Sequence, residues 1–92
     1  MRELFVTTRT ACFADGRQAV CDYYILIDQM DVRGGFSCES YGVRVVGREG
    51  IEGDVSIPNI TVSISRIDAL MEQLTRGFVT PAAVDDIVAD WL

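Results

Sequence analysis

The sequence predicts an α+β domain, in which a four-stranded antiparallel meander is followed by a C-terminal helical hairpin packed on one face of the sheet. Three observations lead to this prediction. Residues before about position 62 alternate between β-branched runs and turn residues, whereas residues 63–92 carry apolar side chains at helical spacing. The chain has 92 residues, enough for a single hydrophobic core. We therefore interpret residues 1–92 as one domain.

The segment 65–76 is predicted to be the first helix, because its apolar residues recur three or four positions apart. Ser65, followed three residues later by Asp68, is a weak form of the capping box and predicts the helix start. Gly77 predicts its end. The apolar face consists of Ile64, Ile67, Leu70, Met71 and Leu74.

The segment 81–92 is predicted to be the second helix. Thr80 is a cap residue and Pro81 suits the first helical position, where its missing N–H group costs nothing. The short connection between the two segments predicts a tight helical hairpin that needs a sheet beneath it. Its apolar face consists of Val84, Ile87, Val88, Trp91 and Leu92.

Four strands are predicted at about residues 3–12, 17–30, 36–48 and 54–62. In the first, Leu4, Val6 and Thr8 alternate with the residues between them, which predicts that these three share one face.

Turn and breaker residues predict how these strands are connected and where irregularities occur. Asp15-Gly16 predicts a hairpin between the first two strands. Gly42 predicts a bulge or a close backbone approach, and Pro58 predicts an edge position for the last strand, because proline cannot donate to a ladder.

The second strand is apolar on both faces, whereas a sheet covered by helices on one side should show clean alternation. Either another subunit covers its second face, or the strand bends so that each half buries a different face. Our hypothesis is a homodimer or a protein partner bound through that second face, with Tyr24, Leu26 and Met30 as contacts.

Every basic residue is arginine: eight arginines stand against fourteen carboxylates, giving a net charge of -6 with no lysine and no histidine. The missing residue types exclude a histidine-based triad, a Schiff-base lysine and a phosphate-loop lysine, so we predict no catalytic residue. The acidic balance argues against a nucleic-acid partner. The alternative is a local basic patch of Arg17, Arg33, Arg44 and Arg48.

The three cysteines, Cys12, Cys21 and Cys38, lie too far apart for the close pairs of a structural zinc site. We interpret them as small buried residues. The alternatives are a reactive thiol or a contact between Cys12 and Cys21 across the first hairpin. Asp28 and Asp31 match no calcium loop and are interpreted as turn residues. We therefore predict no metal and no cofactor.

The longest apolar run, residues 23–27, is far too short to span a bilayer, and the N-terminal residues lack the apolar region of a signal peptide. We expect a cytoplasmic protein without a membrane partner.

The segment Ser40-Tyr41-Gly42-Val43-Arg44-Val45-Val46, with the later pattern of Ile67, Leu70, Leu74, Pro81, Ile87 and Leu92, resembles a family of short, uncharacterised Firmicutes proteins that form a domain of unknown function. The similarity extends over about residues 2–92. The resemblance implies a bacterial, cytoplasmic setting and implies no activity or site.

Two functions from different classes follow. The first is a non-enzymatic protein-interaction or dimerisation module that uses the second face of the sheet. The alternative is a small-molecule binding protein or minor enzyme with a pocket between sheet and helices, lined by Tyr41, Arg44 and Asp22.

Overall fold

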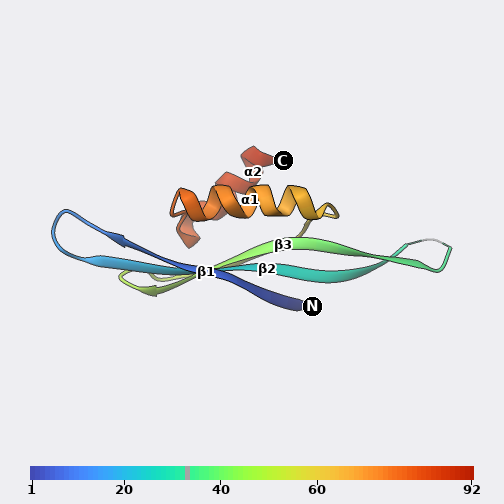
Figure 1. Ribbon diagram of the computed structural model, residues 1–92, viewed down its shortest axis with the longest axis horizontal. Helices are drawn as coiled ribbons and strands as arrows, with labels where there is room; N and C mark the ends of the chain where they lie inside the picture. Colours follow the sequence, from blue (N-terminus) through green and yellow to red (C-terminus); the bar gives the residue numbers. More distant parts are fainter. Residues whose placement is uncertain (33) are drawn as a thin grey trace.

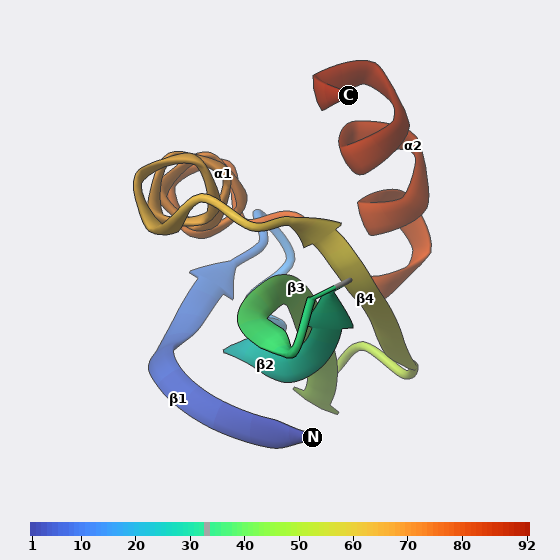
Figure 2. The same cartoon turned by 90° about the vertical axis from the view of Figure 1, so that its right-hand side faces the viewer.

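The computed structural model describes residues 1–32 and 34–92 and confirms the predicted α+β fold. The four strands pair in the order β1-β2-β3-β4, and each pair of neighbours is antiparallel. Both helices lie on the same side of the sheet (Figures 1 and 2). The elements are β1 (Arg2–Cys12), β2 (Gln18–Val32), β3 (Phe36–Glu49), β4 (Asp54–Thr61), α1 (Ile64–Arg76) and α2 (Pro81–Trp91).

The molecule is elongated, with principal dimensions of 57 × 23 × 18 Å. The sheet is longer than the helices above it, so that two hairpins project beyond them in opposite directions (Figure 1). We call residues 9–20, at the β1–β2 hairpin, the first arm, and residues 28–39, at the β2–β3 hairpin, the second arm. The radius of gyration is 14.5 Å, against about 12 Å for a compact domain of this length. The excess reflects the two arms.

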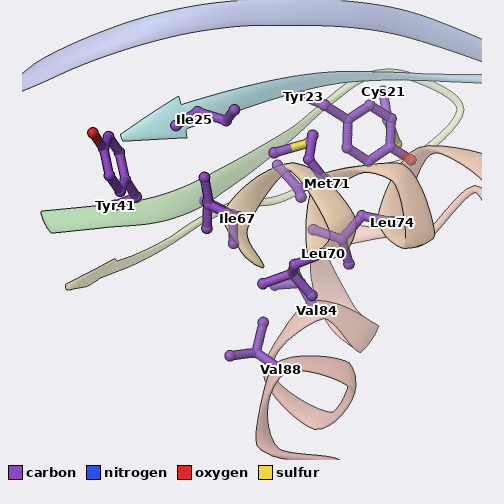
Figure 3. Packing of buried hydrophobic residues seen from close by; sticks show 12 residues of the cluster. Cys21, Tyr23, Ile25, Tyr41, Ile67, Leu70, Met71, Leu74, Val84 and Val88 are labelled. Atoms are coloured by element: carbon purple, nitrogen blue, oxygen red, sulfur yellow. The ribbon is translucent and has the colours of Figure 1, made fainter. Parts of the chain in front are cut away.

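The hydrophobic core lies between the helices and the side of the sheet that faces them (Figure 3). Alternate residues of the two central strands, β2 and β3, point into it, as the two-residue period of a strand requires. The apolar stripes of both helices close over them, as the helical spacing predicts. The buried cluster is Cys21, Tyr23, Ile25, Tyr41, Val43, Val45, Ile67, Leu70, Met71, Leu74, Val84 and Val88.

One hydrogen bond ties the sheet to the connection between the helices. The Tyr23 side chain on β2 is fully buried, and its hydroxyl donates to the carbonyl oxygen of Val79 at 2.9 Å. Val79 lies between α1 and α2, so this bond fixes the point at which the helical hairpin turns. It also gives the buried phenol the partner that a buried hydroxyl requires.

The first helix begins earlier than the sequence pattern predicts. Its N-cap is Ser63 rather than Ser65, and the Ser63 hydroxyl accepts a hydrogen bond from the backbone N–H of Arg66 at 3.3 Å. The prediction from Ser65 and Asp68 was wrong because Ser63 offers the same cap chemistry two residues earlier, which brings Ile64 into the helix.

The first helix ends in a Schellman motif. The N–H of Phe78 donates to the carbonyl of Thr75, and that of Val79 donates to the carbonyl of Leu74 at 3.0 Å. Gly77 is the C-cap, as predicted, but Phe78 takes the left-handed conformation with φ of 45°. Glycine usually fills that position. Phe78 instead packs its ring against the core, which offsets the backbone cost.

Each of the two edge strands contains an irregularity. A bulge between Phe5 and Thr7 shifts the register of β1 on β2, so Leu4 shares a face with Thr7 and the predicted alternation of Leu4, Val6 and Thr8 is wrong. Pro58 lies on β4, which is an edge strand as predicted.

Gly42 is a close-approach glycine, as predicted. A Cβ atom at this position would lie 2.2 Å from the Ile57 carbonyl oxygen, because the backbone of β4 crosses over it. Only glycine fits under that crossing.

Substituting Tyr23 by phenylalanine tests the bond between sheet and helical hairpin. The loss of the hydroxyl removes one hydrogen bond from the part-buried Val79 carbonyl, so we expect a loss of about 1 kcal/mol in the free energy of unfolding. Burial, reinforced by nearby Cys21 and opposed by Arg9, raises the pKa of Tyr23 from 10 to about 12. The neutral phenol therefore stabilises the fold below pH 10, and this contribution is lost as pH rises from 10 towards 12.

Urea unfolding at a series of pH values measures this effect. Two pKa units correspond to about 2 to 3 kcal/mol, so wild type should lose that much more stability in this range than Tyr23→Phe. Tyr24→Phe is the matched control and should keep the wild-type pH dependence. Identical pH profiles for wild type and Tyr23→Phe would contradict the assignment.

Candidate functional site

The side of the sheet away from the helices, which we call the far face, is held together by Arg44. Its Nη1 donates to Glu3 Oε1 at 2.7 Å, and its Nη2 donates to Asp54 Oδ2 at 2.6 Å. These bonds join β3 to both edge strands, because Glu3 lies on β1 and Asp54 on β4. The hydrogen bonds from Arg44 lower the pKa of the Asp54 carboxyl group.

An aromatic pair lies beneath this ion-pair network. The guanidinium carbon of Arg44 is 5.5 Å from the centre of the Tyr24 ring, a cation–π distance. The rings of Tyr24 and Phe5 meet edge to face with their centres 5.5 Å apart. Both views place the N-terminus on the side of the sheet opposite the helices (Figures 1 and 2). The start of β1 therefore contributes to covering the far face.

Asp22 makes a second polar contact on the far face. Its carboxylate is buried and accepts a hydrogen bond from the Thr8 hydroxyl at 2.5 Å. Arg48 lies 3.5 Å from the same carboxylate. These partners account for a buried charge without any ligand.

The predicted interface residues differ in exposure. Leu26 is 1% exposed, Tyr24 is half-buried and Met30 is 44% exposed. Leu26 lies outside the core cluster beneath the helices, because its side chain points to the far face. The second strand therefore buries side chains on both faces within one chain. This burial explains why both of its faces are apolar without another subunit over Leu26.

The three predicted pocket residues do not meet. Tyr41 belongs to the core cluster beneath the helices (Figure 3). Arg44 and Asp22 lie on the far face, because they occupy the strand positions that alternate with the core residues. Tyr41 does line an open groove of about 270 Å³ between the sheet and the start of α1. Its apolar walls are Leu4, Ile25, Ile27, Tyr41, Ile64 and Ile67, and its polar rim includes Arg2, Glu39 and Asp68.

Three consecutive apolar residues of β1 that the sequence prediction did not single out are exposed. Leu4 and Phe5 are each 53% exposed, and Val6 is 39% exposed. They are consecutive on β1, where every residue except Thr7 and Ala11 is exposed. Three apolar residues in a row break the alternation of a half-buried strand, and that signal was available in the sequence. We call Leu4, Phe5 and Val6 the edge patch.

The other edge of the sheet is protected from pairing. Pro58 removes a backbone donor from β4, and the register between β4 and β3 shifts at the residues around it. Within residues 1–32 and 34–92, β1 is therefore the proline-free edge that carries exposed apolar side chains.

The cysteines and arginines form no shared site in the described part of the chain. Cys21 is buried, and burial, with the charge of Asp22, raises the pKa of its thiol. Cys12 lies opposite Gln18 and Cys21 opposite Arg9, so the proposed contact between the two cysteines is wrong. The hairpin register separates them.

The basic patch considered from the sequence is divided among separate ion pairs. Arg17 pairs with Asp15, Arg44 with Glu3 and Asp54, and Arg48 with Asp22. Arg33 lies outside the described residues. Each described arginine of the patch thus has an acidic partner that lowers its net attraction for phosphate.

A comparison with protein families shows which family the chain belongs to. The family's sequence profile matches residues 2–92. The chain belongs to DUF6514, a family of unknown function. The predicted resemblance to an uncharacterised family is thereby confirmed, while the origin of this DUF6514 chain in Firmicutes stays a prediction. No curated protein and no solved structure matches it. Among its described residues, no helix is long and apolar enough to cross a membrane.

Alanine substitutions at two leucines test whether the far face is closed. Leu26→Ala should lower the free energy of unfolding by about 2 to 5 kcal/mol, because the leucine is buried within the single chain. Leu92→Ala is the matched control and should change stability by less than about 0.5 kcal/mol, since Leu92 is 76% exposed. Urea unfolding measures both. Equal small losses would mean that Leu26 is not covered in the isolated chain.

Proposed function

We propose that this DUF6514 chain is a non-enzymatic protein-interaction module that self-associates along β1 in the bacterial cytoplasm. The observation that supports this most is the edge patch, where Leu4, Phe5 and Val6 are exposed together on an open sheet edge. Scattered exposed apolar residues are ordinary, but three consecutive ones on an unpaired strand favour a contact along the strand edge, with Leu4 on the helix side of the sheet and Phe5 on the far face.

This proposal places the contact surface at the β1 edge of the sheet, whereas the sequence analysis predicted it on the far face. Tyr24 supports the surface from beneath, since it packs against Phe5 of the edge patch, whereas Leu26 is buried. Met30 remains available for contact because its side chain is 44% exposed. The Arg44 ion pairs occupy the middle of the far face, where a partner would have to desolvate them. On β1 the ion-paired residues Arg2 and Glu3 precede the edge patch, whose own three side chains are uncharged.

The total exposed surface supports the same function. The chain exposes 5796 Å², whereas a compact monomer of this mass exposes about 5,300 Å². The difference of about 500 Å² approaches the roughly 800 Å² that each partner buries in a standard interface.

A second candidate is a small-molecule binding protein or minor enzyme that uses the groove beside α1. The observation favouring it is the apolar lining that includes Tyr41, Ile64 and Ile67. Such a lining suits an apolar ligand. The groove is open to solvent and Asp22 and Arg44 lie on the other side of the sheet, so we rank this function second.

Arginine substitutions at two valines test the proposed function. Val6→Arg places a charge in the edge patch and should abolish self-association, because the charge would have to be desolvated. Val62→Arg is the matched control and should associate like wild type, since Val62 is 62% exposed and lies outside β1. Sedimentation equilibrium measures the mass of each, and wild type should approach twice the 10.2 kDa chain mass.

Two outcomes would contradict the proposal. The first is a wild-type mass of 10.2 kDa at the highest concentration at which the chain stays in solution. The second is an equal loss of association in both arginine variants. The groove function predicts instead that Ile64→Arg removes binding of an apolar fluorescent probe, while Val6→Arg leaves that binding intact.

A further inference from the structure

We propose that the partner is a second copy of this chain, and that two copies meet along their β1 edges in antiparallel orientation about a two-fold axis near the edge patch. This inference rests on the proposed function and adds its geometry. The first arm of each copy then lies alongside the second arm of the other.

The path of β1 determines which arms meet. Arg2 pairs with Ile27, so β1 begins at the base of the second arm, and Cys12 pairs with Gln18, so β1 ends within the first arm. Antiparallel β1 edges therefore bring opposite ends of the two molecules together. Parallel edges would bring like arms together.

The charges of the two arms are complementary. The first arm holds Arg9 and Arg17 against the single carboxylate of Asp15, which pairs with Arg17, so the arm keeps a net charge of +1. The second arm holds three carboxylates, on Asp28, Asp31 and Glu39, against one arginine, and Glu39 is paired with Arg2 of the same chain. Antiparallel association places the basic arm beside the acidic arm twice in each dimer. Because each chain carries a net charge of -6, long-range repulsion opposes association in any orientation, and local matching selects the orientation.

The apolar groups of the arms match in the same orientation. Phe13 on the first arm is 47% exposed, and Met30 on the second arm is 44% exposed. A methionine beside an aromatic ring is a favourable contact. Two such contacts would flank the edge patch, where Leu4, Phe5 and Val6 of the two copies meet at the centre.

The shape of the molecule indicates where the dimer buries surface. The arms project beyond the helices at both ends of a molecule 57 Å long (Figure 1). Burying the edge patch alone would leave both arms exposed. Contact along the full β1 edge covers the patch and one side of each arm, which extends the contact towards the area of a standard interface.

Charge reversal tests this geometry. Arg17 and Asp31 are exposed residues on the two arms, so their substitution should leave the fold intact. Arg17→Glu and Asp31→Arg should each weaken dimerisation roughly ten-fold at low salt, because each single reversal puts like charges together at two places. The double variant Arg17→Glu with Asp31→Arg should recover an affinity near that of wild type. Sedimentation velocity measures the dimer dissociation constants, and the urea midpoint of each variant checks folding.

The possible results separate this inference from the proposed function. Recovery in the double variant supports the antiparallel dimer. A wild-type dimer disrupted by Val6→Arg, with a double variant no better than the single variants, overturns the arm pairing and leaves the proposed function standing. A wild-type monomer overturns both.

Discussion

The structure depends on covering one face of β2 with the helical hairpin, and Tyr23 fixes where that cover sits. Its ring is buried among core residues from both layers, and its hydroxyl bonds to the carbonyl of Val79 between the helices. If the hairpin turned elsewhere, the stripes that include Leu74 and Val84 would lose the sheet beneath them. A domain this small has little other apolar burial to replace that loss.

The opposite side of the sheet is closed by different means. Arg44 reaches the carboxylates of Glu3 and Asp54 on the two edge strands and lies over Tyr24. This layer keeps the far face within one chain and leaves Leu26 buried. The exposed apolar residues of the sheet lie instead at the β1 edge, in the edge patch. Pro58 protects the β4 edge from pairing with another strand. The proposed self-association uses this asymmetry between the two edges.

The fold could be predicted from local patterns, because helical spacing, Thr80-Pro81, Asp15-Gly16 and Gly42 each depend on a few neighbouring residues. The candidate site could be predicted only in part, because the run Leu4-Phe5-Val6 is visible in the sequence but the exposure of these residues is not. The exposure of Leu26 and Leu4 depends on the bonds that Arg44 makes to distant strands and on the bulge after Phe5. Neither feature can be recognised from the alternation of apolar and polar residues along a strand. The positive φ at Phe78 could not be predicted either, because the packing of its ring against the core outweighs the backbone preference of phenylalanine.

Hydrogen–deuterium exchange measured at low and high protein concentration tests the central claim, which is that β1 is a contact edge and β4 is not. Both are edge strands of one sheet, so β4 serves as an internal control. The account predicts that amides of β1 around Leu4, Phe5 and Val6 exchange more slowly as concentration rises, while amides of β4 exchange at a constant rate. Exchange in β1 that does not depend on concentration would contradict it.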